Sequence, residues 1–123
     1  MQVAKPWGWE LIWARTPKYV GKLIHIKEGQ RLSRQYHTQK DETIFVIKGT
    51  LTLEIGEGTL QQTLTLIKGQ NFRISPYTIH RFIAEDEEVD LIEVSTPELQ
   101  DVVRLADEYG RADPQEEAIS LLD

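Results

Sequence analysis

The chain contains no cysteine, which excludes disulfide bridges and metal sites built from thiolates. It also lacks an apolar run of membrane-spanning length, and its first residues do not form the apolar segment of a signal peptide. Internal repeats and low-complexity stretches are absent as well. We therefore expect a cytoplasmic protein that folds around an ordinary hydrophobic core and has no membrane as a partner.

Acidic residues outnumber basic ones, but unevenly along the 123 residues. The first 84 residues carry 12 Lys and Arg against 6 Asp and Glu, whereas residues 85–123 carry 2 against 14. The acidic region has an ordinary explanation as a solvated surface. Alternatively, the basic part attracts an anionic small molecule. Nucleic acid is not an expected partner, because the basic residues are scattered and the net charge is −6.

Short segments of alternating apolar and polar residues recur at about ten-residue spacing, with turn residues between them. This pattern predicts an all-β fold, a sandwich or barrel over about residues 7–96, within a single domain of residues 1–123. The predicted strands are Trp9–Ala14, Tyr19–Lys27, Arg31–His37, Glu42–Lys48, Thr50–Ile55, Thr59–Ile67, Asn71–Ser75, His80–Ala84 and Glu88–Ser95.

The C-terminal segment of about residues 97–123 differs in pattern. Apolar residues between positions 99 and 106 have mixed helical spacing, which predicts a short helix. A second helix is predicted after Asp113, a suitable N-cap that is followed by proline and by the glutamate of a capping box. We expect both helices to pack on the barrel or on a second subunit.

Four polar side chains are spaced so that a small barrel would direct them at one metal ion. Alternation along a strand puts Gln35 and His37 on one face. Glu42 opens the next apolar run after a polar turn, so an antiparallel partner brings it beside His37, and His80 follows a later turn. Each residue alone has an ordinary structural explanation. As a set, these nitrogen and oxygen ligands suit zinc, iron, nickel or manganese, whereas His25 is expected at the surface.

The ligand-bearing face extends backward along the same predicted strand. Arg31 and Ser33 share the face of Gln35 and His37. A guanidinium and a hydroxyl on this face are suited to binding a phosphate group. The alternative is that Arg31 lies in water at the rim of the barrel.

Two spaced motifs carry a resemblance to a known family. They read Gly29-x5-Gln35-x-His37-x4-Glu42-x6-Gly49 and Gly69-x6-Pro76-x3-His80. They resemble the two motifs of cupins, which are small jelly-roll barrels, with glutamine in place of the first histidine. Residues 3–111 as a whole are similar to the C-terminal half of type II phosphomannose isomerases, which fuse a cupin isomerase to a mannose-1-phosphate guanylyltransferase. The segments that carry this similarity are Lys5–Glu10, Arg31–His37, Ile92–Val94 and Asp101–Arg111.

The chain departs from that family's pattern around the motifs. Thr43 and Ile44 stand where the family has His-Trp, Arg34 replaces a leucine, and Ser75 and Tyr77 replace the proline and glycine of the second motif. The nucleotidyltransferase half with its glycine-rich loop is missing, so nucleotide transfer is not expected.

The resemblance implies interconversion of mannose 6-phosphate and fructose 6-phosphate. It places one divalent metal ion, zinc ahead of iron, nickel and manganese, on Gln35, His37, Glu42 and His80. Such an ion polarises the oxygens at C1 and C2 of the sugar and stabilises an enediolate. A base then moves the proton between the two carbons.

The base itself is not identified by the sequence. Lys5, Lys40 and Arg111 are candidates for the catalytic role, and Arg31, Arg104 or Arg111 for holding the phosphate. Structural alternatives exist, since Lys5 lies in an N-terminal strand rich in aromatics and the last two arginines lie among acidic residues.

Two other functions fit the same residues. One is a non-catalytic cupin that binds a sugar or nucleotide sugar and partners a separate nucleotidyltransferase. The other is an oxygenase that uses Fe(II), because this ligand set also accepts iron. The tryptophans at positions 7, 9 and 13 suggest an interface or a core, and we expect a homodimer.

Overall fold

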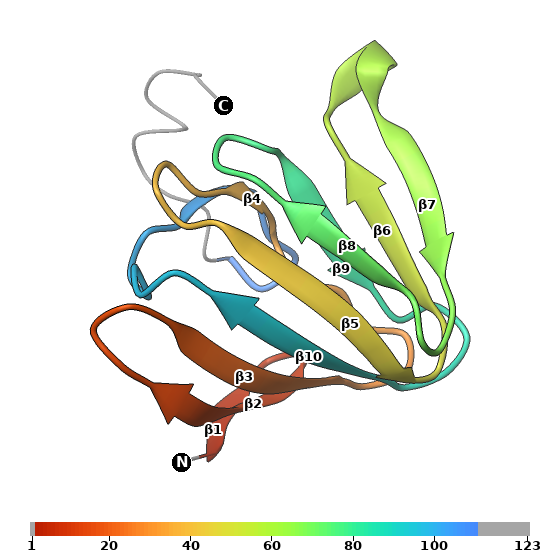
Figure 1. Cartoon of the computed structure of the whole chain (residues 1–123). Coiled ribbons are helices and arrows are strands. Elements are labelled where there is room, and N and C mark those ends of the chain that lie inside the picture. Colours follow the sequence, from red (N-terminus) through yellow and green to blue (C-terminus); the bar gives the residue numbers. More distant parts are fainter. Residues whose placement is uncertain (1, 111–123) are drawn as a thin grey trace.

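The computed structural model of the chain describes residues 2–110, which form two antiparallel β-sheets that face each other (Figure 1). The first sheet has six strands in the order β1-β2-β3-β10-β5-β8. These strands are β1 Gln2–Lys5, β2 Gly8–Arg15, β3 Val20–Ile26, β10 Val89–Ser95, β5 Glu42–Lys48 and β8 Asn71–Ile74.

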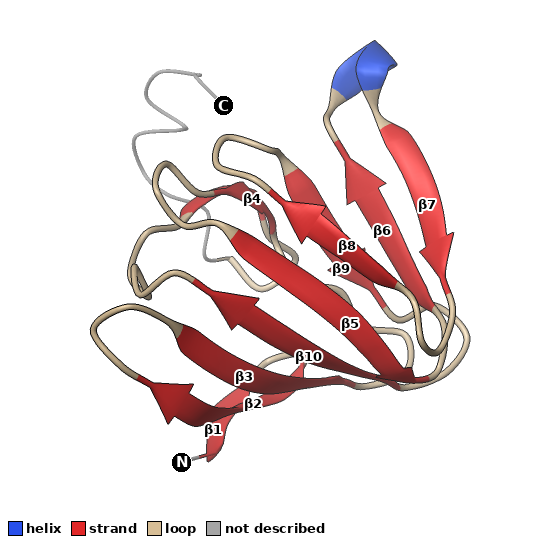
Figure 2. Ribbon diagram, in the orientation of Figure 1, coloured by secondary structure: helices blue, strands red, loops and turns tan. Residues whose placement is uncertain are grey.

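The second sheet has five strands in the order β11-β4-β9-β6-β7. They are β11 Val103–Ala106, β4 Arg34–Tyr36, β9 His80–Ile83, β6 Leu51–Ile55 and β7 Gln62–Leu66. A single 3-10 turn, Gly58–Leu60, caps the β6–β7 hairpin at its projecting tip (Figure 2). Among residues 2–110 it is the only helical element, and no helix there is long and apolar enough to span a membrane.

The core between the sheets follows from the alternation of the strands. In β5 and β10 every second residue is buried, so one face of each strand turns inward. Leu91 pairs with Ile24 on one side and with Val46 on the other, and all three are almost fully buried. Burial of each such side chain stabilises the fold by about 2 kcal/mol. The core consists of Trp7, Ile24, Ile26, Ile44, Val46, Leu51, Leu53, Leu66, Ile74, Phe82, Ala84, Val89 and Leu91.

The turn between β5 and β6 requires glycine. Gly49 has a φ of 81°, and a Cβ atom there would lie 2.3 Å from the carbonyl oxygen of Glu88. Any side chain would therefore have to move the backbone of the neighbouring loop. The turn carries the chain from β5 in the first sheet to β6 in the second.

The all-β prediction is confirmed. Each of the nine predicted strand segments overlaps an observed strand, and Glu42–Lys48 has the predicted bounds. Two strands were not predicted, β1 and β11. Both are edge strands of a sheet. Pairing with the neighbouring strand, rather than an alternation of apolar and polar residues in their own sequence, determines their structure.

The prediction of a helix between residues 99 and 106 is wrong. Residues 99–100 form a turn, residues 101–102 have no regular structure, and Val103–Ala106 forms β11, which pairs with β4. The free edge of β4 offers unpaired backbone groups, and the β-branched Val103 fits a strand better than a helix. The helix predicted after Asp113 lies outside the described residues, as does Arg111.

Candidate metal centre

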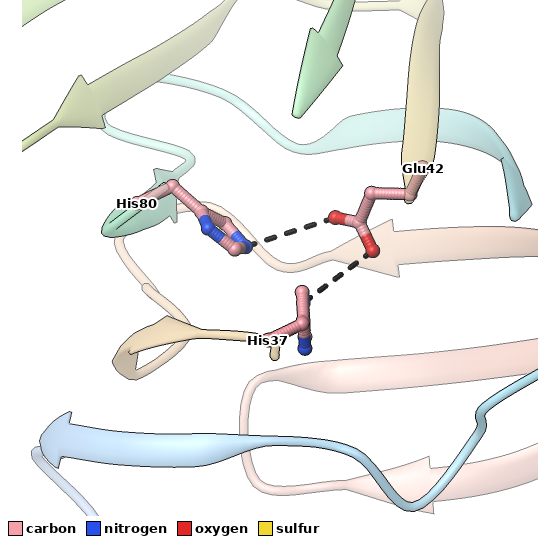
Figure 3. Close-up of side chains that lie close together, drawn as sticks. All are labelled: His37, Glu42 and His80. Atoms are coloured by element: carbon pink, nitrogen blue, oxygen red, sulfur yellow. Dashed lines mark ion pairs between the residues drawn. The ribbon is translucent and has the colours of Figure 1, made fainter. Parts of the chain in front are cut away.

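Three buried side chains converge at one end of the space between the sheets. Glu42 is the first residue of β5, His80 is the first residue of β9, and His37 directly follows β4. Figure 3 shows the three side chains pointing toward one another from these separate segments. One Glu42 carboxylate oxygen lies 3.5 Å from Nε2 of His37, and the other lies 3.7 Å from Nε2 of His80. One ligand atom from each residue lies within 4.8 Å of the other two.

Both imidazoles are oriented by the backbone. Nδ1 of His37 donates to the carbonyl oxygen of Asp101 at 2.6 Å, and Nδ1 of His80 donates to the carbonyl oxygen of Thr78 at 2.8 Å. A carbonyl oxygen only accepts, so in the neutral ring the proton is on Nδ1 and Nε2 carries a lone pair. Both Nε2 atoms are buried and have no hydrogen-bond partner. This is the arrangement in which histidine binds a metal ion.

The two histidines stay neutral at pH 7. Burial, and after it the Lys40 ammonium, lowers the pKa of the His37 imidazole. Burial also lowers the pKa of His80, although the Glu42 carboxylate opposes this effect. Neutral imidazoles do not have to lose a proton before they bind a cation. Two such nitrogens and one carboxylate form a donor set typical of a catalytic zinc site, with a position left for substrate or water.

A buried ion pair adjoins the carboxylate. Nζ of Lys40 lies 3.0 Å from one oxygen of Glu42 and 3.1 Å from one oxygen of Glu93 in β10. Burial and the charge of Glu93 raise the pKa of Glu42, and Lys40 only partly counteracts them. Burial acts in the same sense on Glu93, but Lys40 and Lys22 outweigh it and hold the pKa of Glu93 below its usual range. The two carboxylates raise the pKa of Lys40 despite its burial, so this side chain is an ammonium ion.

The loop between β4 and β5 is held by Asp101. Its carboxylate accepts the backbone N–H groups of Thr38, Gln39 and Lys40 and the hydroxyl of Thr38, at 2.6 to 3.0 Å. Burial favours a raised pKa for Asp101, but these donors prevail and keep the pKa below its usual range. The same residue orients His37 through its carbonyl oxygen. Asp101 therefore fixes both a candidate ligand and the loop that carries Lys40.

His37 and Glu42 line a polar cavity of about 350 Å³, which is the size of a small-molecule site, and His80 is not among its lining residues. Its walls carry five cationic side chains against three carboxylates, and His37, which also lines it, is neutral. The cations are Lys5, Arg15, Lys22, Lys40 and Arg104, and the carboxylates are Glu10, Glu42 and Glu93. A bound divalent cation would add to the positive balance, which favours an anionic ligand.

Most of the residues predicted for the site lie at this cavity. Gln35, Ser33, Lys5, Lys40 and Arg104 all line it together with His37 and Glu42. Gln35 pairs with His80 across β4 and β9, and its side-chain oxygen accepts the hydroxyl of Ser33 at 2.6 Å.

Two other residues considered in the sequence analysis, Arg31 and His25, lie outside this cavity. Arg31 is not among the residues that line it, and its guanidinium pairs with Glu108 at 3.4 Å. His25 was predicted to lie outside the metal set and at the surface; it lies outside the set, but its side chain is only 17% exposed, with its ring stacked on Trp9 and hydrogen-bonded to Asp90 at 2.6 Å.

Sequence reasoning missed Glu10, Lys22, Glu93 and Asp101. A signal for two of them existed, because Lys22 and Glu93 occupy inward positions in strands whose other inward residues are mostly apolar. A charged residue in such a position requires a partner. Asp101 had no such signal, since its role depends on a loop more than sixty residues away.

The fold has many relatives among solved structures. KdgF from a Halomonas species matches with a TM-score of 0.69 at 23% identity, over 78% of this chain and 84% of that one. The capsular polysaccharide assembling protein CapF from Staphylococcus aureus matches with a TM-score of 0.75 at 14% identity, over 85% of this chain. Oxalate decarboxylase from Lactobacillus farciminis matches with a TM-score of 0.70 at 16% identity, also over 85% of this chain.

This chain spans only 33% of the length of CapF and of the decarboxylase. At these identities the likeness concerns the fold alone. No curated protein sequence matches the chain. The model of the cupin domain family, however, matches residues 22–95, which include all three converging side chains. With its two facing antiparallel sheets and this match, the chain belongs to the cupin domain family.

Proposed function

We propose that this cupin is a metal-dependent sugar-phosphate isomerase that interconverts mannose 6-phosphate and fructose 6-phosphate. The observation that carries the proposal is the pair of buried histidine Nε2 atoms without hydrogen-bond partners, facing Glu42 beside a cavity with a cationic lining. The sequence similarity to type II phosphomannose isomerases supports the choice of substrate.

In this proposal His37, Glu42 and His80 hold one divalent metal ion, with zinc preferred, and Gln35 is a further ligand. A bound metal ion supplies polarisation of the sugar oxygens at C1 and C2. The chain supplies the rest of the site. Lys5, Arg15 and Arg104 are cationic groups at the cavity that suit the phosphate of the substrate.

Proton transfer between C1 and C2 needs a base, and the ionisation of the site narrows the choice. Lys40 is an ammonium ion, so it can donate a hydrogen bond to a substrate oxygen but cannot accept a proton. The base is therefore not Lys40, and Lys5, the other described candidate, is one of the cationic groups that suit the phosphate. Its position at the end of β1, at the cavity wall, is compatible with contact to a bound sugar.

One observation favours the second candidate function, a non-catalytic cupin that binds a sugar phosphate or nucleotide sugar. The three carboxylates that line the cavity all face cations, since Glu10 pairs with Lys22 at 3.2 Å and the other two pair with Lys40. Carboxylates held in this way are poorly placed to serve as the base.

Turnover separates the two functions. Protein loaded with zinc, nickel or manganese is incubated with mannose 6-phosphate, and fructose 6-phosphate is measured by a coupled assay. We expect turnover that is lost in His37→Ala and kept in the control His25→Ala, whose side chain lies outside the cavity. Saturable binding of the sugar phosphate without turnover would establish the binding function instead, and neither binding nor turnover would refute both.

We also propose that the chain forms a homodimer through the outer face of the six-stranded sheet. Leu11, Leu23, Ile92 and Phe45 pair in register across β2, β3, β10 and β5. Phe45 in this row is 41% exposed, and the neighbouring Val94 and Trp13 are 46% and 55% exposed. Six strands about 4.8 Å apart give a face wide enough for the roughly 800 Å² that each partner buries in a stable interface.

A cytoplasmic location remains a prediction.

A further inference from the structure

The position of Lys40 beside the candidate metal centre has a consequence for cation binding. Its ammonium group lies between two carboxylates, 3.0 Å from Glu42 and 3.1 Å from Glu93, and its side chain is only 7% exposed. Glu42 and Glu93 come from neighbouring strands, β5 and β10. A buried carboxylate without a cation is strongly unfavourable, so Lys40 supplies the positive charge that both groups need in the absence of metal.

A divalent cation on Glu42 would meet this ammonium ion at close range. The metal would coordinate the carboxylate to which Lys40 is already paired, and the two positive charges would repel each other in a medium of low polarisability. Glu93 offsets that repulsion, because it gives Lys40 a second, independent partner at almost the same distance. Its own side chain is 5% exposed, so water contributes little to this balance.

The neighbours of Glu93 fix its charge in turn. Lys22 pairs with Glu93 directly across β3 and β10, and Glu10 lies 3.2 Å from Lys22. Charges therefore alternate from Glu10 through Lys22, Glu93 and Lys40 to Glu42 along the wall of the cavity. Within this series Lys40 is the one cation that contacts a metal ligand.

We propose that Lys40 is the resident cation of the metal-free centre and competes with the divalent ion for Glu42, while Glu93 accepts Lys40 when the ion enters. The inference rests on the metal-binding part of the proposed function and does not depend on isomerase turnover. It assigns opposite effects to the two partners of one ion pair. Loss of the ammonium strengthens metal binding, and loss of the Glu93 charge weakens it, because Lys40 then remains on Glu42.

The test is calorimetric titration of the whole chain with Zn²⁺ after removal of metal by a chelator. We expect Lys40→Met to bind Zn²⁺ roughly tenfold or more tightly than the parent protein, and Glu93→Gln to bind it roughly tenfold or more weakly. The double variant Lys40→Met/Glu93→Gln should bind Zn²⁺ with an affinity close to that of the parent protein. Lys48→Met and Glu88→Gln are matched controls, since they remove an exposed Lys–Glu pair at 2.7 Å and should leave the affinity unchanged.

Weakened binding in both single variants would overturn the proposal, because it would mean that Lys40 merely orients Glu42 as a hydrogen-bond donor. Equal binding in all variants would overturn it while leaving the metal centre intact. If neither the parent protein nor Lys40→Met binds Zn²⁺, the inference and the metal centre both fail. If Lys40→Met does not fold, two other variants test the proposal. Weaker Zn²⁺ binding by Glu93→Gln, with the parental affinity restored in Lys40→Gln/Glu93→Gln, supports it. Unchanged Zn²⁺ binding by Glu93→Gln contradicts it.

Discussion

At the scale of single residues, Tyr77 shows how a departure from the family pattern affects the structure near the site. It occupies the position where the resembling family has glycine, and its φ is 68°, in the left-handed region. Its N–H donates to the carbonyl oxygen of His37 at 2.6 Å, and its ring stacks on Tyr36. The turn that supports His37 therefore requires a conformation that costs a tyrosine about 1 kcal/mol.

We predict that Tyr77→Gly is more stable to urea than Tyr77→Ala by about 1 kcal/mol. Both substitutions remove the ring stack, but only glycine relieves the left-handed strain. The comparison of the two variants isolates the backbone term. Equal stability, or a more stable alanine variant, would show that the turn has no left-handed requirement.

The histidines make the stability of the metal-free protein depend on pH. The pKa values of His37 and His80 are lowered in the folded state, whereas both residues have a pKa of about 6.5 when unfolded. Below this pH the unfolded state binds more protons, so stability falls with decreasing pH until the folded pKa values are reached.

We predict that the free energy of unfolding of the metal-free protein decreases between pH 7 and pH 5, and that His80→Gln shows a smaller decrease. Urea unfolding in the presence of a chelator at both pH values measures the difference. The same loss in the parent protein and in His80→Gln would contradict the lowered pKa of His80.

The candidate ligand residues were largely predictable from the sequence, because each lies in a recognisable local pattern. His37 and Glu42 flank a polar turn, and the two motifs give their spacing. Glu93 lies within Ile92–Val94, one of the segments that carry the family resemblance, but its role depends on Lys40, which reaches it from the loop between β4 and β5. Contacts of this kind follow from three-dimensional packing, and spacing along the chain does not contain them.

At the scale of elements, the segment before β11 organises the metal centre, although its sequence predicted a helix. Alternation predicted the buried strands well, since β3, β5 and β10 each have an apolar face. It failed for β11, because that strand exists through its pairing with the short strand β4. The pairing places Asp101 against the loop of residues 38–40.

We predict that Asp101→Asn destabilises the protein by about 2 kcal/mol and weakens Zn²⁺ binding, because an amide cannot replace a carboxylate that accepts four hydrogen bonds. Urea unfolding and calorimetric titration measure the two effects. Asp41→Asn is the control, since its pair with Arg73 is exposed and should contribute little to stability. Similar losses in both variants would mean that the loop is not held by Asp101.

At the scale of the whole molecule, the oligomeric state is the prediction most open to direct measurement. One chain has a mass of 14.2 kDa, and light scattering after size-exclusion chromatography should give twice that mass. Phe45→Asp should shift the protein to the monomer, because it places a charge in the apolar row. Tyr19→Asp, at another exposed aromatic position outside that row, serves as the control. A monomeric parent protein would refute the homodimer.

The central claim is that His37, Glu42 and His80 form a metal centre, and metal content per chain tests it most directly. Protein stripped with a chelator, incubated with Zn²⁺ and freed of excess metal should contain about one ion per chain by elemental analysis. His37→Ala and His80→Ala should lose most of it, and His25→Ala should retain it. A folded parent protein that holds no zinc, nickel, manganese or iron would contradict the account, and so would equal metal content in all three variants.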